Sequence, residues 1–131
     1  MGAVRVLIAD SDQCLLASYR ETLLHSGFEV ATAADGLVCL DRLRQFRPDV
    51  LVLEPSLPWG GGDGVLTLMH EEADLPLVPV IILTSGGDRG LLYRLARFHV
   101  EGYHVKPLEG KALLERIQAI AQEQYAGQKS A

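Results

Sequence analysis

Apolar residues along the chain fall into two patterns: short continuous runs, and longer stretches in which they recur every three or four positions. The short runs, rich in valine, isoleucine and leucine, predict β-strands, and the recurring pattern predicts amphipathic helices. Strands are expected at 4–9, 29–33, 50–53, 80–83 and 103–105. Helices are expected after Asp12 and after Asp35, and at 64–72, 88–98 and 109–124.

The alternation of strand and helix indicates the architecture. Strands that alternate with helices form a parallel sheet, because each right-handed crossover lays its helix on a face of the sheet. We therefore predict an α/β protein with a flavodoxin-like three-layer fold, in which a five-stranded parallel sheet of order 2-1-3-4-5 is covered by five helices. The 29–33 strand is more polar than the others, which favours a place at the sheet edge.

Local signals predict where the helices begin and which residues they bury. Ser11 or Asp12 is the expected N-cap of the first helix, and Gly27 is expected to end it. In the second helix we expect Leu37 and Leu43 to share the inward face with Leu40. Helical spacing selects the same kind of inward position elsewhere, at Leu16, Tyr19, Leu23, Leu24, Val65, Leu68, Met69, Leu113, Leu114, Ile117, Ile120 and Ala121.

The stretch Pro48–Pro58 organises the rest of the chain. Its apolar run, Val50–Leu53, is typical of a strand buried on both faces, and the run stops abruptly at Glu54. Ligands of parallel α/β sheets bind just beyond the carboxyl ends of the strands. Because other strands also stop on polar side chains, several chemical groups should converge at one sheet edge: Asp10, Glu54, Thr84 and Lys106.

Composition limits what the protein can be. A chain of 131 residues with 48% hydrophobic content builds one domain, which we place at 4–124, with 125–131 as a flexible tail or the start of a linker. The net charge of −5 and the pI near 5.3 argue against direct nucleic-acid binding. The sequence has no signal-peptide pattern and no apolar run of membrane-spanning length, so we expect a cytoplasmic protein that does not bind membranes.

The cysteines and histidines show no metal-ligand spacing. Cys14 and Cys39 fall within predicted helices, and we expect them to be buried thiols in a reducing compartment. The four histidines are expected to be structural or solvated rather than metal ligands: His25, His70, His99 and His104.

Five marks in the right order give the chain a family resemblance. They are Asp10 after the first strand, the block Pro48–Pro58, the pair Asp63-Gly64, Thr84 at the end of the fourth strand, and the segment Gly102–Pro107. With these marks the chain resembles the receiver domain of bacterial two-component response regulators, from about Val4 to about Gln122. The resemblance implies phosphorelay signalling, in which a histidine kinase passes a phosphoryl group to an aspartate at the end of the third strand with the help of a divalent metal.

Two positions depart from the family pattern. Glu54 stands where the resemblance places the phosphoryl-accepting aspartate, and Ser11 stands where it places a second metal-binding acid. Glutamate is one methylene longer, which moves the carboxylate by roughly 1.5 Å, and a misplacement of ~1 Å can cost on the order of 100-fold in rate. Ser11 removes a charge from the metal pocket, so Asp10 and Glu54 should bind Mg²⁺ weakly or not at all, and no other cofactor is expected.

We therefore predict a pseudo-receiver, a phosphorylation-independent protein-interaction module that is not an enzyme. Two alternatives stay open. One is a working receiver that uses Glu54 or Asp12 in an unusual way, although the expected duty of Asp12 is to cap the first helix. The other, ranked lower, is a flavodoxin-like cofactor-binding protein. Asp10-Ser11-Asp12 occupies the turn where such a protein would carry a glycine-rich phosphate loop.

Glu54 has a second interpretation through Lys106. A direct ion pair could hold a partly active-like conformation permanently, because the family's phosphorylated aspartate also engages this lysine. The pair could instead be the neutralised remnant of a lost site. Moving a two-state element from mostly off to mostly on takes about 5 kcal/mol, and a partly exposed pair rarely supplies that much, which favours the remnant.

The resemblance also implies a switch and a partner face. Thr84 and Tyr103 match the family's switch pair, and Pro107 matches a cis-proline. In the family, partners dock on the face formed by the fourth helix, the fifth strand and the fifth helix. We expect a signalling protein there (a kinase, an output domain or a regulator) or a second copy of the chain. Three arginines are expected to lie on this face beside Tyr103: Arg89, Arg94 and Arg97.

The segment Trp59–Gly62 is longer than the resemblance implies. Four residues separate Pro58 from Asp63. Three consecutive glycines predict a conformationally free loop, and Trp59 is expected to face outward or to cap the site. The segment is either a tolerated surface insertion or a lid or partner contact beside Glu54.

Overall fold

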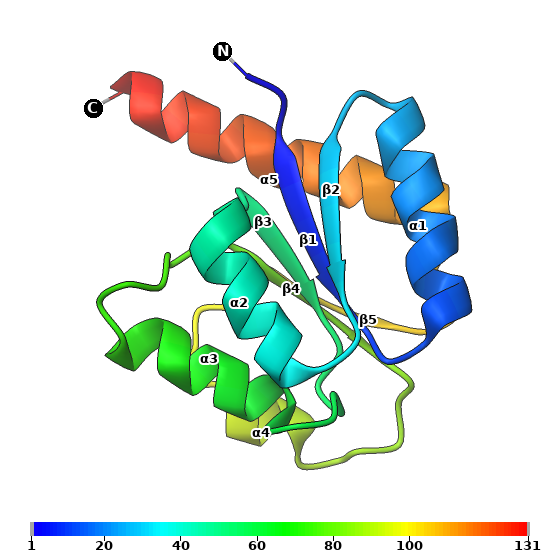
Figure 1. Ribbon diagram of the computed structural model, residues 1–131, viewed down its shortest axis with the longest axis vertical. Helices are drawn as coiled ribbons and strands as arrows, with labels where there is room; N and C mark the ends of the chain where they lie inside the picture. The colour runs from blue at the N-terminus through cyan, green and yellow to red at the C-terminus, as the bar shows by residue number, and fades with distance from the viewer. Residues whose placement is uncertain (1, 131) are drawn as a thin grey trace.

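The computed structural model describes the backbone of residues 2–130 and the side chains of residues 2–124. Within this range five parallel strands form one sheet in the order β2-β1-β3-β4-β5, and helices connect them (Figure 1). The predicted fold class, strand order and number of helices are confirmed. The strands are β1 (Arg5–Ala9), β2 (Glu29–Ala33), β3 (Val50–Leu53), β4 (Val80–Thr84) and β5 (Gly102–Val105). The helices are α1 (Gln13–His25), α2 (Gly36–Phe46), α3 (Gly61–Glu71), α4 (Leu91–Leu95) and α5 (Gly110–Ser130).

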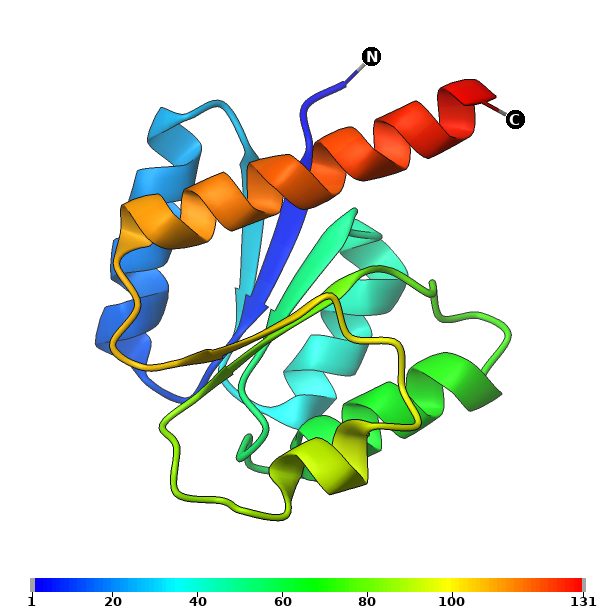
Figure 2. The same cartoon turned by 180° about the vertical axis from the view of Figure 1, so that it is seen from behind.

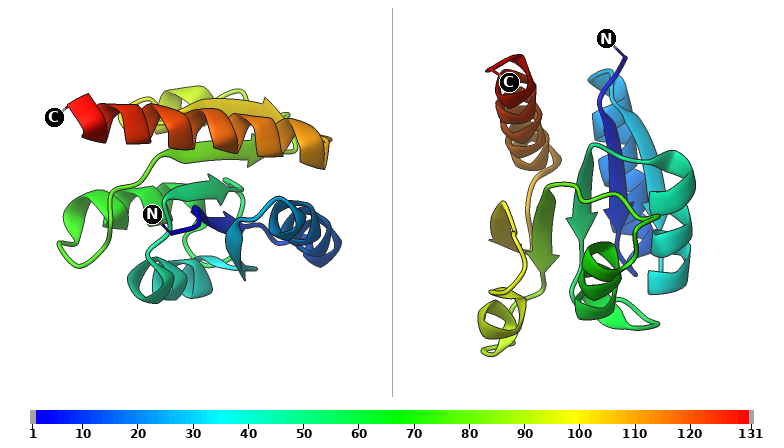
Figure 3. Two further views of the ribbon diagram at one scale, coloured as in Figure 1. Left: turned by 90° about the horizontal axis from the view of Figure 1, so that it is seen from above. Right: turned by 90° about the vertical axis from the view of Figure 1, so that its left-hand side faces the viewer.

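Two apolar layers cover the sheet, one on each face. Successive side chains of a strand point to opposite faces, so Leu7 and Leu51 pack with α2, α3 and α4, whereas Ile8 and Val52 pack with α1 and α5. Figure 2 shows α5 crossing the second face, and Figure 3 shows the sheet between α5 and the α2–α3 side. Because β3 is covered on both faces, all of its residues are buried, as its continuous apolar run predicts.

Asp12 is the N-cap of α1, one of the two candidates that the sequence left open. Its Oδ1 accepts hydrogen bonds from the backbone N–H groups of Cys14 and Leu15, at 3.0 and 3.1 Å. Gly27 (φ 89°) follows the end of α1, and β2 lies at the sheet edge; both were predicted. Among the described residues, no helix is long and apolar enough to span a membrane.

Two leucines expected to face inward are exposed. Leu37 in α2 is 60% exposed, and Leu24 at the end of α1 is also exposed. Helix α2 instead buries Gly36, Cys39 and Leu43, which are three and four positions apart. That spacing defines the inward stripe, so Leu37, one position after Gly36, is turned to solvent.

The two cysteines have different environments, and the prediction that both are buried was wrong for one of them. Cys14 lies in the exposed first turn of α1, whereas Cys39 is buried in α2. Burial raises the pKa of the Cys39 thiol to about 12. Cys39 is therefore a packed, protonated core residue.

Helix α3 begins at Gly61, three residues before its expected start, because the glycine run builds its first turn. Gly60 (φ 88°) precedes the helix, and the Gly62 N–H donates to the Pro55 C=O at 2.9 Å. A Cβ on Gly62 would lie 2.9 Å from the Pro55 Cα, so no side chain fits there. The segment predicted as a free loop is thus largely a helix start fixed by close backbone contact.

Helix α4 is much shorter than the helix expected at 88–98. It begins at Leu91 rather than at Asp88, whose side chain accepts a hydrogen bond from the Gly90 N–H at 3.0 Å, and it ends at Leu95. Phe98 is buried as a core residue, but it lies in a turn after the helix. Helix α5, in contrast, continues to Ser130, past the expected end at 124. The tail predicted at 125–131 has side chains outside the described residues and stays a prediction.

Gly36 allows the loop between β3 and α3 to rest on the start of α2. Its N–H donates to the Pro58 C=O at 2.8 Å, and a Cβ on Gly36 would collide with the Trp59 carbonyl oxygen. The Trp59 side chain is 70% exposed, so it faces outward. The backbone of this segment is therefore anchored to α2 while its one large side chain is in solvent.

We expect Gly36→Ala to lower the free energy of unfolding by about 1–3 kcal/mol, because the added methyl group has to displace the loop. Gly64→Ala is the matched control: it lies inside α3, and no atom is within 4 Å of its Cβ position. There alanine should leave stability unchanged or raise it by up to about 1 kcal/mol. Urea denaturation measures both, and equal stability of the two variants would contradict the close contact at Gly36.

Candidate functional site

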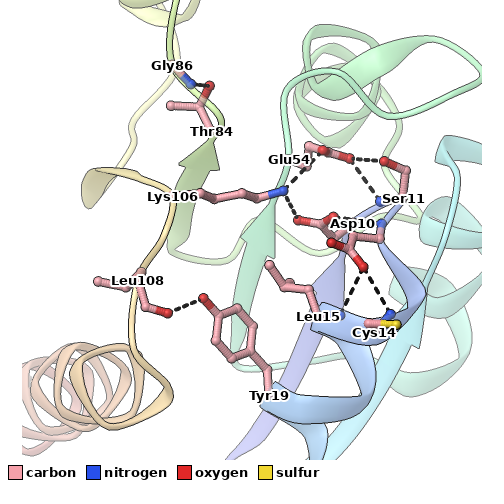
Figure 4. Close-up of polar contacts among 11 residues, drawn as sticks. Asp10, Ser11, Cys14, Leu15, Tyr19, Glu54, Thr84, Gly86, Lys106 and Leu108 are labelled. Carbon is pink, nitrogen blue, oxygen red and sulfur yellow. Dashed lines mark hydrogen bonds and ion pairs between the residues drawn. The ribbon is translucent and has the colours of Figure 1, made fainter.

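Three strand ends bring ionisable side chains to one edge of the sheet. Asp10 follows β1, Glu54 follows β3 and Lys106 follows β5. In the parallel register Ala9 lies opposite Leu53, so Asp10 and Glu54 leave the sheet side by side. Figure 4 shows both carboxylates facing the ammonium group of Lys106. The structure therefore brings these three sequence-selected residues together.

The Lys106 ammonium pairs with both acids at once. Its Nζ lies 2.8 Å from Asp10 Oδ2 and 3.2 Å from Glu54 Oε1. The acids are almost completely buried, with Asp10 1% and Glu54 5% exposed, and the lysine side chain is 15% exposed. Buried charges are stable only when paired, so one ammonium supplies the countercharge for two carboxylates. The Lys106–Pro107 peptide bond beside it is cis, as the family resemblance implied.

Ser11 binds the second oxygen of Glu54. Its backbone N–H and its Oγ–H both donate to Glu54 Oε2, at 2.9 and 2.8 Å. The remaining Asp10 oxygen, Oδ1, accepts from the Asp12 N–H at 2.9 Å. All four carboxylate oxygens of the two acids are thus engaged within the protein. From the sequence, Ser11 was expected as a lost metal-binding acid or as the N-cap of α1, and neither expectation indicated this role, although a hydroxyl can donate where an aspartate cannot.

These contacts shift the pKa values of Glu54 and Lys106 in opposite directions. Burial raises the pKa of Glu54, but the hydrogen bonds from Ser11 and Lys106 outweigh it, so the pKa lies below its ordinary value. Burial lowers the pKa of Lys106, but Asp10 and Glu54 outweigh it, so that pKa lies above its ordinary value. Both groups are therefore charged around neutral pH.

The acids as arranged do not fit a divalent cation. Mg²⁺ requires near-octahedral oxygen coordination at about 2.0–2.1 Å, but the oxygens of Asp10 and Glu54 are turned to Lys106 and Ser11. The ammonium already lies between the carboxylates. Among the side chains described, no group of three or more Asp, Glu, His and Cys residues is placed to hold a metal ion.

Thr84 and Tyr103, the residues matched to the family's switch pair, lie in separate environments. Thr84 Oγ1 accepts from the Gly86 N–H at 3.1 Å (Figure 4), and Tyr103 lies opposite Ile82 in the edge strand β5, partly exposed. Tyr19, expected only as a core residue, donates its hydroxyl proton to the Leu108 C=O. This bond ties α1 to the segment that carries Lys106, and helical periodicity alone could not indicate it.

Two of the three arginines predicted beside Tyr103 point elsewhere. Arg94 pairs with Asp63 in α3 at 3.0 Å and with Asp88 at 2.8 Å. Arg97 donates to the Thr67 hydroxyl of α3 at 3.2 Å. The expected arginine cluster was therefore wrong, because the side of α4 and its following turn that carries these residues faces α3.

Apolar side chains are exposed on α4 and β5 instead. Arg89 lies in the loop before α4, outside the helix. The exposed large apolar residues of these two elements are Leu92, Tyr93, Tyr103 and Val105, with Tyr93 the most exposed at 91%.

Comparison with known proteins identifies the family. The family model described as response regulator receiver domain matches residues 6–118. The chain is 36% identical over 119 residues to the transcriptional regulatory protein PrrA of Mycobacterium tuberculosis, covering 88% of this chain and 49% of that protein. It is 27% identical over 114 residues to the polar-differentiation response regulator DivK of Brucella anthropi, covering 87% and 93%.

The solved structures agree with this match. A CheY-like response regulator receiver domain protein from Methanospirillum hungatei superimposes with a TM-score of 0.87 at 25% identity, covering 96% of this chain and 99% of that chain. The chain therefore belongs to the response regulator receiver domain family, the signalling modules of two-component systems. It spans about half the length of curated relatives such as PrrA.

We expect Lys106→Met to lower the free energy of unfolding by about 3 kcal/mol, because it leaves two buried carboxylates without a countercharge. Lys111→Met, on the exposed side of α5, is the control and should change stability by less than about 0.5 kcal/mol. Urea denaturation at neutral pH measures both. A Lys106→Met variant as stable as the control would show that the pairing contributes nothing.

Because the pKa of Glu54 is lowered in the folded protein, we expect the free energy of unfolding to decrease as the pH falls into the acid range. The folded state binds the Glu54 proton less tightly than the unfolded state, so this contribution is present above the ordinary glutamate pKa of about 4.3 and disappears as the pH falls through the lowered folded value. Unfolding free energies measured across this range should fall less steeply for Glu54→Gln than for the wild type. The exposed control Glu123→Gln should retain the wild-type slope; a slope flattened equally in both variants would refute the assignment to Glu54.

Proposed function

We propose that this receiver domain signals without phosphorylation, as a protein-interaction module. The observation that supports this is the Lys106 ammonium lying between Asp10 and Glu54, with Ser11 bound to the other Glu54 oxygen. Phosphoryl transfer to a carboxylate needs a free oxygen in line with the donor phosphorus and a cation that neutralises the phosphate. Here the acceptor position holds Glu54, a longer acid whose two carboxylate oxygens contact Lys106 and Ser11. The Lys106 ammonium lies between the two carboxylates that would bind the cation.

The same contacts argue for weak Mg²⁺ binding at most. A cation bound by Asp10 and Glu54 would have to displace an ammonium that is paired in a largely buried site, and Ser11 supplies no second anionic ligand. Asp12, the other acid nearby, is committed to capping α1. A receiver that works through Asp12 would have to give up that cap.

We interpret the Glu54–Lys106 contact as a fixed structural pair rather than a permanent activating signal. A contact biases a two-state element only by the difference in its strength between the two states. A complete shift from off to on needs about 5 kcal/mol, and a buried ion pair rarely supplies that as a net difference, because the cost of removing its charges from water offsets much of their attraction. The pair therefore holds the strand ends together without switching the domain fully on.

The proposed partner is another signalling protein: a kinase, an output domain or a regulator. We place its contact on the α4–β5–α5 face, where the exposed side chains of Leu92, Tyr93, Tyr103 and Val105 supply apolar area. A second copy of the chain is the other candidate for this face. The names of the relatives, a transcriptional regulatory protein and a polar-differentiation regulator, are compatible with such a role.

The test is phosphorylation with a small-molecule donor. After treatment with phosphoramidate and Mg²⁺, intact mass spectrometry of the wild type should show no added phosphoryl group. The Glu54→Asp, Ser11→Asp double variant, which restores the family's two acids, should gain Mg²⁺-dependent labelling. A labelled wild type would contradict the proposal, and mapping the label would show whether Glu54 or Asp12 accepts it.

The double variant could also remain unlabelled. That result would contradict the assignment of the lost chemistry to these two positions. Ser11→Asp alone separates charge from length: it places a second carboxylate beside Glu54 and should lower stability by like-charge repulsion without giving any label.

A further inference from the structure

The sheet edge formed by β2 borders a positively charged groove. A shallow cavity of about 440 Å³ follows the strand from Val30 to Thr32 and is flanked by α1 and α2. Arg20 of α1 and Arg42 of α2 line it, together with Arg5 at the start of β1 and with Gln45 and Phe46. The residues lining it include three arginines and no carboxylate, in a chain whose net charge is −5.

The strand presents open backbone groups to this groove. The Glu29 N–H and the Ala33 C=O bond toward the β1 side, each at 2.9 Å. Backbone groups alternate in direction along a strand, so the N–H and C=O groups of Val30 and Thr32 point away from the sheet. Of these groups, the Thr32 C=O accepts a long hydrogen bond, 3.5 Å, from Arg42 Nε. This edge can therefore accept the backbone of a further strand.

The arginines of the groove are weakly paired. Arg5 lies 3.7 Å from Glu29 and Arg42 lies 3.8 Å from Asp41, in exposed pairs of a kind that contributes little. Arg20 makes no ion pair with the part of the chain that is described. Guanidinium groups bind carboxylates through two parallel hydrogen bonds. Carboxylates of a partner could therefore bind here more closely than those of the chain itself.

We propose that the β2 edge is a docking site for an acidic, extended peptide segment of a partner protein, which adds to the sheet as a sixth strand. Main-chain hydrogen bonds to Val30 and Thr32 would hold it. Its side chains would alternate between the α1 side, with Arg20, and the α2 side, with Arg42. A shallow groove along a strand suits a peptide better than a small molecule, which needs an enclosing pocket.

This docking site is separate from the α4–β5–α5 face. The strand order places β2 and β5 at opposite edges of the sheet. A partner bound at β2 would leave the face at β5 free, so the domain could bridge two proteins. The competing explanation is that the edge arginines only prevent pairing between copies of the sheet, since charged side chains often protect exposed edges.

Titration of the ¹⁵N-labelled chain with a capped peptide of alternating valine and glutamate tests the proposal. Chemical shifts should change mainly at Val30, Thr32 and the neighbouring lining residues, and the amides of Val30 and Thr32 should exchange more slowly with solvent. Added salt should weaken binding. A peptide with lysine in place of glutamate should not bind. No binding of the glutamate peptide, equal binding of the lysine peptide, or shifts confined to another face would overturn the proposal.

Two variants separate charge from backbone pairing. The Arg20→Glu, Arg42→Glu double variant should weaken binding by at least about tenfold, because it replaces attraction with repulsion. Thr32→Pro removes an outward N–H without removing an inward one and should weaken binding about tenfold. Lys111→Glu, an exposed charge reversal on α5, should leave binding unchanged. A folded double variant that retains wild-type affinity would contradict the proposal even if Thr32→Pro failed to fold.

Discussion

A single ammonium group holds the functional edge of this domain together. Lys106 follows β5, yet it pairs with the acids that follow β1 and β3, at 2.8 and 3.2 Å. Asp10 and Glu54 are nearly inaccessible to water, so each needs a countercharge within the protein. The other contacts of this edge are arranged around that pairing: Ser11 binds the free oxygen of Glu54, and Tyr19 fixes the segment after Lys106 through Leu108.

Glu54 and Ser11, which we interpret as departures from the family pattern, contact each other. A longer acid at position 54 reaches both Lys106 and Ser11, and a hydroxyl at position 11 donates to it where a second carboxylate would repel it. The two side chains, which looked like separate losses in the sequence, form a hydrogen-bonded contact that occupies Glu54 Oε2, whereas Asp10 Oδ2 has the ion pair with Lys106 but no hydrogen-bond donor among the described residues. The contact between Glu54 and Ser11 links the proposed loss of phosphorylation to a structural gain at the same edge of the sheet.

The fold was predictable because its determinants are local. Continuous apolar runs marked β3 and β4 as buried strands, and Asp12 and Gly27 marked the ends of α1. Two of the errors came from contacts between residues that no local pattern links. The start of α3 depends on Gly62 passing close to Pro55, and Arg94 faces α3 because it pairs with Asp63, 31 residues away. The convergence of Asp10, Glu54 and Lys106 follows from strand order, and the sequence also suggested the ion pair between Glu54 and Lys106. The second pairing of Lys106, with Asp10, and the role of Ser11 depend on side-chain geometry that no sequence pattern encodes.

The most direct measurement is a crystal structure of the protein grown with Mg²⁺ and beryllofluoride, a mimic of the phosphoryl group. We expect Lys106 to remain paired with Asp10 and Glu54 at the distances seen here, with neither ion in the pocket. Mg²⁺ coordinated by Asp10, together with beryllofluoride on the Glu54 carboxylate and a displaced Lys106, would contradict the central claim that the ammonium closes this site.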